Sequence, residues 1–160
     1  MEIPPPAELP DTWGVDDLAL VLQDKRFTAD GGIDYTLTAN DRLVGYAGDR
    51  LLVNGMFGPT WRAPRQWVRL RLLNGCNARI LVLRLSDATP MLQIANEAGM
   101  LSAPSARSTL TLAPGERAEV LVDFGSADVG QVTRLLARTS GGGMGMGMGM
   151  GMGAGSDTEV

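Results

Sequence analysis

The sequence predicts an all-β fold, a sandwich or a barrel, and three observations carry this prediction. Short apolar runs of strand length recur along the chain, and several of them alternate between apolar and polar residues. Turn-forming residues separate these runs, among them asparagine-glycine pairs. No window shows sustained apolar spacing at three and four residues, which an amphipathic helix requires. A chain of 160 residues fits one domain with a short tail.

Eight or nine strands are expected. In chain order they cover residues 18–22, a run around Tyr35 and Leu37, and then 50–53, 66–73, 79–85, 91–95, 108–112, 117–124 and 131–137. The clearest of them is 79–85, where Leu81, Leu83 and Leu85 alternate with other residues. Because successive side chains of a strand point to opposite faces, these leucines are expected to share one face.

The two ends of the chain differ in composition from its middle. Residues 1–10 hold four prolines, which predicts an extended connector. Residues 140–160 are rich in glycine and methionine, and glycine at this density disfavours an ordered core segment, so we expect a flexible tail. The folded domain is therefore expected over residues 11–139.

Composition and charge argue against several classes of partner. The net charge is -4, and the densest basic stretch, residues 62–71, alternates with apolar residues as a strand with one solvated face would. We therefore expect no nucleic-acid partner. No run approaches about 18 apolar residues, so no membrane span is expected. The first ten residues lack the basic start and apolar run of an export signal, and one cysteine cannot form an internal disulfide.

The absence of histidine removes most catalytic and metal-binding arrangements. Ser-His-Asp and Cys-His sites, blue-copper sites and structural zinc sites all need histidine or several cysteines. The sequence therefore predicts no catalytic and no cofactor-binding residue.

Three other polar residues are candidates for a catalytic or reactive role. Asp16 and Asp17 are adjacent, so on an extended chain they point to opposite faces, and we expect solvated turn residues instead of an acid/base pair. Cys76 would be reactive if a nearby arginine lowered its pKa. The favoured alternative is a small buried apolar side chain.

The glycine- and methionine-rich tail is the one segment with a chemical indication. Its methionines alternate with glycine, and thioether sulfur is a soft ligand that suits Cu(I). A weak Cu(I) site is therefore predicted, against the alternative of a low-complexity tract without a ligand. The predicted ligands are Met144, Met146, Met148, Met150 and Met152.

An ordered series of motifs resembles a known family. The motifs are WGVDD at 13–17, VLQDKRF at 21–27, GDRLLVNG at 48–55, RLRLLNGCNAR at 69–79 and PGERAEVLV at 114–122. Over roughly residues 11–139 the chain resembles the second cupredoxin, or plastocyanin-like, domain of bacterial multicopper oxidases, in particular the periplasmic copper efflux (cuprous) oxidases. The run at 69–79 is the most specific of the five.

The resemblance implies a cupredoxin-like Greek-key β-sandwich that lacks its last strand, in a fragment truncated at both ends. In this family a Met-Gly-Met stretch precedes that strand, which here would begin near residues 158–160. Such oxidases couple oxidation of Cu(I) or phenols to reduction of dioxygen to water. Their copper ligands come from the first and third domains, and the second domain supplies none.

The resemblance therefore implies a structural domain without a cofactor of its own, inactive alone. Its partners would be the first and third domains of the same oxidase, with copper in that parent protein, a periplasmic location and a role in copper homeostasis. Two alternatives stay open: a weak Cu(I)-binding module acting through the tail, and a stand-alone cupredoxin-like interaction domain.

Overall fold

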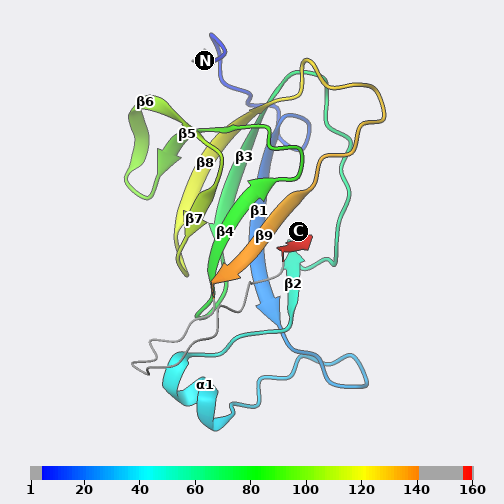
Figure 1. Cartoon of the computed structure of the whole chain (residues 1–160), viewed down its shortest axis with the longest axis vertical. Helices are drawn as coiled ribbons and strands as arrows, with labels where there is room; N and C mark the ends of the chain where they lie inside the picture. Colours follow the sequence, from blue (N-terminus) through cyan, green and yellow to red (C-terminus); the bar gives the residue numbers. More distant parts are fainter. Residues whose placement is uncertain (1–4, 141–156, 160) are drawn as a thin grey trace.

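Two β-sheets packed face to face make up the fold of the computed structural model, which describes residues 5–140 and 157–159 (Figure 1). The elements in chain order are β1 (Asp17–Lys25), α1 (Ala39–Val44), β2 (Arg50–Val53), β3 (Trp67–Asn74), β4 (Ile80–Leu85), β5 (Met91–Asn96), β6 (Gly99–Arg107), β7 (Leu110–Leu112), β8 (Arg117–Asp123), β9 (Leu135–Ser140) and β10 (Asp157–Glu159). The predicted all-β sandwich is confirmed.

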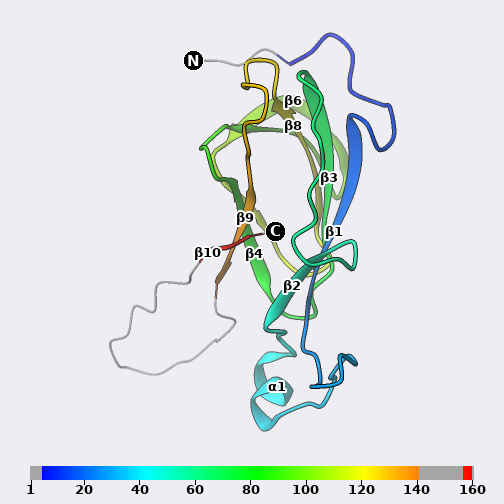
Figure 2. The same ribbon diagram turned by 90° about the vertical axis from the view of Figure 1, so that its right-hand side faces the viewer.

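The larger sheet has the strand order β2-β1-β3-β8-β5-β6, and the smaller one has the order β10-β9-β4-β7. Only β1 and β3 pair in parallel, with Asp17 opposite Arg69, and all other neighbouring strands of the described residues are antiparallel. Figure 2 shows the two layers edge-on. Because β3 and β4 are consecutive but lie in different sheets, the chain crosses between the layers at residues 75–79.

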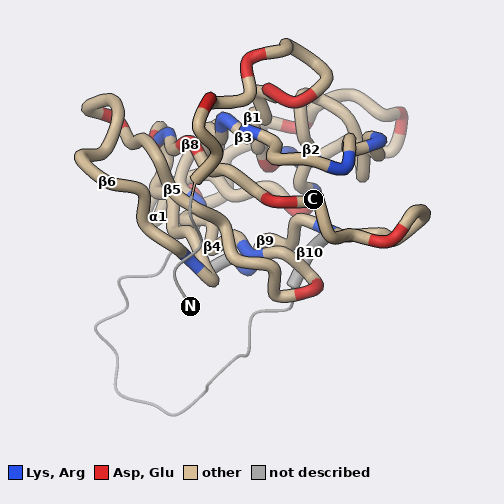
Figure 3. The backbone as a smooth tube through the Cα atoms, turned by 90° about the horizontal axis from the view of Figure 1, so that it is seen from above, with Lys and Arg blue, Asp and Glu red and all other residues tan. Residues whose placement is uncertain are grey.

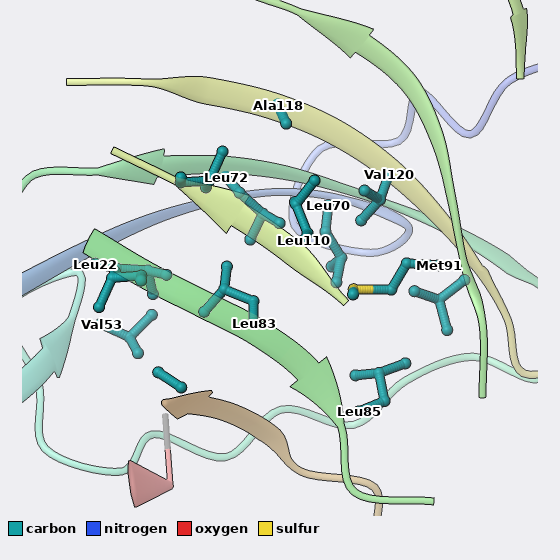
Figure 4. Packing of buried hydrophobic residues seen from close by; sticks show 14 of the residues in the cluster. Leu22, Val53, Leu70, Leu72, Leu83, Leu85, Met91, Leu110, Ala118 and Val120 are labelled. Atoms are coloured by element: carbon teal, nitrogen blue, oxygen red, sulfur yellow. The ribbon is translucent and has the colours of Figure 1, made fainter. Parts of the chain in front are cut away.

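The core lies between the two sheets, and strict alternation builds it (Figure 4). In β3 every second residue is buried, and in β4 the buried residues are the predicted Leu81, Leu83 and Leu85. Leu22 from β1 and Val120 from β8 complete the opposite wall. Each such side chain contributes about 1.5–3 kcal/mol when it is fully buried. The inward faces predicted from the period of two are therefore the faces that hold the sandwich together.

The strand predicted around Tyr35 and Leu37 is wrong. Residues 34–38 form no strand, and they lead into α1, which the sequence analysis did not predict. The helix begins at a capping box in which Thr38 and Asp41 bond each other's backbone N–H groups. None of the residues of α1 is buried, so it shows no apolar stripe from which its period could be recognised.

Strand β6 was also not predicted, because it lies at an edge of the larger sheet and is almost wholly exposed. Its pairing with β5 shifts register between Gln93 and Ala95, and Pro104 lies within it. Proline and register irregularity are common protections for an edge strand, since both discourage pairing with another chain.

Strand β10 pairs antiparallel with the end of β9, with Asp157 opposite Arg138. It lies within residues 140–160, and it coincides with the place where the family resemblance puts the start of the last strand. Backbone pairing of these three residues extends the smaller sheet by one strand.

Candidate functional site

The predicted Cu(I) ligands, Met144 to Met152, lie outside the described residues. Among the residues that are described, no group of three or more histidine, cysteine, aspartate and glutamate side chains could hold a metal ion. The polar side chains that the fold does bring together form two groups. One lies around Asp24 at the end of β1, and the other lies on the outer face of the larger sheet.

The first group, here called the Asp24 cluster, consists of Asp24, Gly48, Cys76 and Arg79. Asp24 follows Leu22 by two residues, so its side chain shares the inner face of β1 and is 2% exposed. Its Oδ2 accepts hydrogen bonds from the Gly48 backbone N–H (2.7 Å) and from Arg79 Nε (3.0 Å). Arg79 Nη2 also donates to the Gly48 carbonyl. The guanidinium of Arg79 thereby balances the charge of the buried Asp24 carboxylate, although the two residues lie 55 positions apart in the sequence.

Asn74 shapes the connection that delivers Arg79 to this cluster. Its fully buried side-chain amide donates to the carbonyls of Arg79 and Leu112, both at 2.8 Å, and its Oδ1 accepts from the Cys76 N–H at 3.0 Å. Most of the hydrogen-bonding capacity of the amide is therefore used, by two residues of this connection and by Leu112 of β7. The Asn-Gly-Cys-Asn-Ala-Arg run is thus a structural motif that closes the passage from β3 to β4.

Cys76 is buried within this motif, in agreement with the favoured interpretation of the sequence. Burial, followed by the negative charge of Asp24, raises the pKa of its thiol from 9.0 to about 12. Its Sγ lies 3.9 Å from the Leu22 carbonyl oxygen. The thiol stays protonated at neutral pH, so it is unsuited to act as a nucleophile or a metal ligand.

We expect the Cys76 thiol to resist modification in the folded chain. A pKa raised from 9.0 to about 12 lowers the thiolate fraction about a thousandfold at neutral pH, and burial blocks access as well. The measurement is the rate of reaction with a chromogenic disulfide reagent, with and without denaturant. Equal rates in the two conditions would contradict the burial described here.

The second group is a ladder of charges across β1, β3 and β8. Arg71 Nε donates to Asp17 Oδ1 at 2.8 Å, and Arg69 Nε donates to Glu119 Oε2 at the same distance. Arg71 Nη1 lies 3.9 Å from Glu119 Oε1, which links the two pairs. Figure 3 shows that Lys or Arg positions and Asp or Glu positions both occur near the labels of β1, β3 and β8. Each charge of the ladder faces an opposite charge, so the ladder offers no unpaired group to a substrate.

The expectation that Asp16 and Asp17 are solvated turn residues is wrong about their solvation, because both are buried, and only Asp16 lies in a turn. Asp17 is buried and paired with Arg71, while Asp16 accepts hydrogen bonds from the Thr12 N–H (2.9 Å) and from Gln66 Nε2 (2.7 Å). Their partners in β3 and just before it come from more than forty positions away in the sequence. Local turn chemistry therefore could not reveal them.

A shallow hollow of about 650 Å³ opens where β5 and β6 meet the turn between β7 and β8. Glu97 and Arg117 on its wall form an ion pair at 2.6 Å. The pair is exposed, so it needs no ligand to balance its charge.

The sequence of the chain is similar to those of known proteins. No protein-family model matches the chain. The cell division protein FtsP of Edwardsiella tarda is 47% identical over 127 residues, which is 79% of this chain and 26% of the relative. FtsP of Escherichia coli (strain K12) is 42% identical over 125 residues, 78% of this chain and 26% of the relative.

Solved structures of bacterial oxidases superpose on the same region. The laccase-like multicopper oxidase CueO from Ochrobactrum sp. gives a TM-score of 0.78 at 41% identity, covering 94% of this chain and 31% of that one. McoA, the multicopper oxidase of Aquifex aeolicus, gives 0.78 at 33% identity, covering 92% and 31%. The chain thus spans about a quarter to a third of the length of the proteins it matches.

The protein is a cupredoxin-like β-sandwich domain. More particularly, the predicted resemblance to a domain of bacterial multicopper oxidases is confirmed over nine-tenths of the length of this chain. No helix among the described residues is long and apolar enough to cross a membrane.

Proposed function

We propose that this chain is the copper-free structural domain of a larger protein of the multicopper-oxidase type. The observation that carries the proposal is the absence of histidine from a chain that superposes over 94% of its length on a copper oxidase. The copper centres of such oxidases depend on histidine imidazole ligands. The domain would then act as a spacer that holds catalytic domains in position, and its described polar groups are consistent with this because they pair with one another.

In finer detail, the chain is proposed as the second of three cupredoxin domains, with the first and third as its partners. The parent protein would couple oxidation of Cu(I) or phenols to reduction of dioxygen to water in the periplasm, as part of copper homeostasis. Support comes from the similarity to CueO and McoA and from the small share of those chains that it covers.

The purified chain tests the structural role directly. We expect no stoichiometric Cu(II) binding, no absorption band of the blue-copper type near ~600 nm and no turnover of Cu(I) or phenols, since the chain has no imidazole to hold copper. Copper analysis and oxidase assays of the full gene product supply the comparison. Turnover by the isolated chain would overturn the proposal.

A second candidate function concerns the parent protein. The curated relatives are named as cell division proteins, and their identity of up to 47% supports a division role as the alternative to an oxidase role for the full gene product. Deletion of the gene would then lengthen cells, and a full product without bound copper would restore normal length. Normal cell length after deletion, together with copper-dependent turnover by the full product, would exclude it.

A third candidate function is the weak Cu(I) site of the tail. It rests on the alternation of thioether side chains with glycine between Met144 and Met152. A competition titration with a Cu(I) chelator would compare the whole chain with a chain ending at Ser140. Greater copper uptake by the whole chain is expected, and equal uptake by both would remove the candidate.

A further inference from the structure

The chain makes an excursion between β1 and β2 that lies beyond the ends of both sheets. This segment, residues 26–46 and here called the 26–46 excursion, includes α1 and lies below the sandwich in Figures 1 and 2. It contributes one apolar side chain, Tyr46, to the buried set. Phe27 is half-buried, and the remaining large apolar side chains are exposed: Ile33 (62%), Tyr35, Leu37, Leu43 (84%) and Val44.

Polar and aromatic contacts, not apolar burial, fix the conformation of the excursion. Arg26 forms an ion pair with Asp41 at 2.7 Å, and its guanidinium lies 4.4 Å from the centre of the Tyr46 ring. The Tyr46 hydroxyl accepts from the Arg26 N–H at 2.9 Å and donates to the Asp34 carbonyl at 3.0 Å. Tyr35 stacks on Tyr46 with ring centroids 4.5 Å apart. The ion pair also lowers the pKa of Asp41 to about 2, so the carboxylate stays charged at neutral pH.

The apolar surface continues onto the turn after β2. Phe27 and Phe57 are in ring contact, with centroids 5.4 Å apart, and Phe27 forms a backbone bridge with Ile33. Phe57 and its neighbour Met56 are both exposed. The excursion surface is therefore defined here by Ile33, Tyr35, Leu37, Leu43, Val44, Met56 and Phe57.

An exposed apolar residue by itself needs no explanation, but several of them on one fixed segment do. Here the polar contacts described above fix the fold of the segment while these side chains remain exposed. A surface that is already ordered loses little conformational entropy on docking, so it is well prepared to bind. The excursion surface is therefore suited to bind a partner.

We propose that the excursion surface docks against another domain of the same polypeptide, which rests on the function proposed above. The chain spans only 26–31% of the similar proteins, so most of such a polypeptide is available as the partner. The charge of the excursion favours a protein over an anionic membrane. Its two arginines and three aspartates leave it slightly acidic, which does not favour attraction to anionic lipid headgroups.

Thiol labelling of the full gene product tests this docking. A Leu43→Cys variant places a thiol on the excursion surface, and a Val129→Cys variant places one at a position that is 88% exposed and lies outside it. The native Cys76 is buried and adds little background. We expect a maleimide to label the Leu43→Cys variant at least about tenfold more slowly than the Val129→Cys variant, because reaction then needs local opening of the interface.

Equal labelling rates of the two variants would overturn the proposal. Slow labelling that speeds up on dilution would also overturn it, because the partner would then be a second copy of the protein. A cysteine substitution could itself loosen the interface. Amide hydrogen exchange is therefore also measured on the unsubstituted full product. Peptides covering residues 36–46 are expected to exchange more slowly than those covering 124–134, and equal exchange would contradict docking.

These outcomes separate the docking proposal from the proposed function. Copper-dependent turnover by the isolated chain, or a full product without any further domain, would remove the structural-domain function. A full product that contains further domains, but in which the Leu43→Cys thiol labels as fast as the control, would remove only the docking.

Discussion

Replacing Gly48 with alanine is expected to destabilise the chain by about 3 kcal/mol. A Cβ atom at this position would lie 2.2 Å from the Lys25 backbone nitrogen and 2.6 Å from the Asp24 carbonyl carbon. Both neighbours are backbone atoms of β1, so they cannot move aside as a flexible side chain would. The Gly48 N–H would also be displaced from the Asp24 carboxylate. Chemical denaturation of the two proteins measures the loss.

Gly125→Ala is the matched control for this substitution. There the added Cβ would lie 3.0 Å from Asp123 Oδ1, an atom of an exposed side chain that can rotate away. We expect a change of less than about 1 kcal/mol, as is usual for surface positions. Similar losses for the two variants would mean that close approach to β1 does not decide the identity of residue 48.

Replacing Arg79 with methionine is expected to cost about 3 kcal/mol of unfolding free energy, because it leaves the Asp24 carboxylate buried without its cationic partner. Asp24 Oδ1 already has no hydrogen-bond partner among the described atoms, so nothing is at hand to replace the guanidinium. Denaturant unfolding monitored by tryptophan fluorescence measures the effect.

The control is the same substitution at Arg117, whose ion pair with Glu97 is well exposed on both sides. Exposed pairs contribute about 0–1 kcal/mol, so Arg117→Met should be nearly silent. If Arg79→Met changed the free energy of unfolding as little as Arg117→Met, the Asp24–Arg79 pair would contribute nothing measurable to stability.

The strands that face the core on one side could be predicted from the sequence, because burial on that side imposes the period of two. β3 and β4 are examples. Elements without a buried face left no such trace, and for that reason α1 and the edge strand β6 were missed. The signal for α1 was present in the capping pair of Thr38 and Asp41.

The polar clusters were harder to predict for a different physical reason. An ion pair such as that of Asp17 and Arg71 depends on which strands become neighbours, and a single sequence carries little information about strand order. Asp24 did leave a signal, since it occupies an inward position in register with Leu18, Leu20 and Leu22. A charged residue at such a position predicts a buried partner, although it does not identify Arg79.

The parallel pairing of β1 with β3 also bears on how the protein is made. Asp17 lies opposite Arg69, and Trp67 lies opposite Asp123, so each central strand must wait for a partner that is synthesised much later. At about 5–20 residues per second, β1 leaves the ribosome roughly 3 to 10 seconds before β3 can join it. During that interval the leucines of β1 are exposed and can contact other nascent chains. The spacing of β1, β3 and β8 along the gene thus sets how long the growing polypeptide is vulnerable to misassembly.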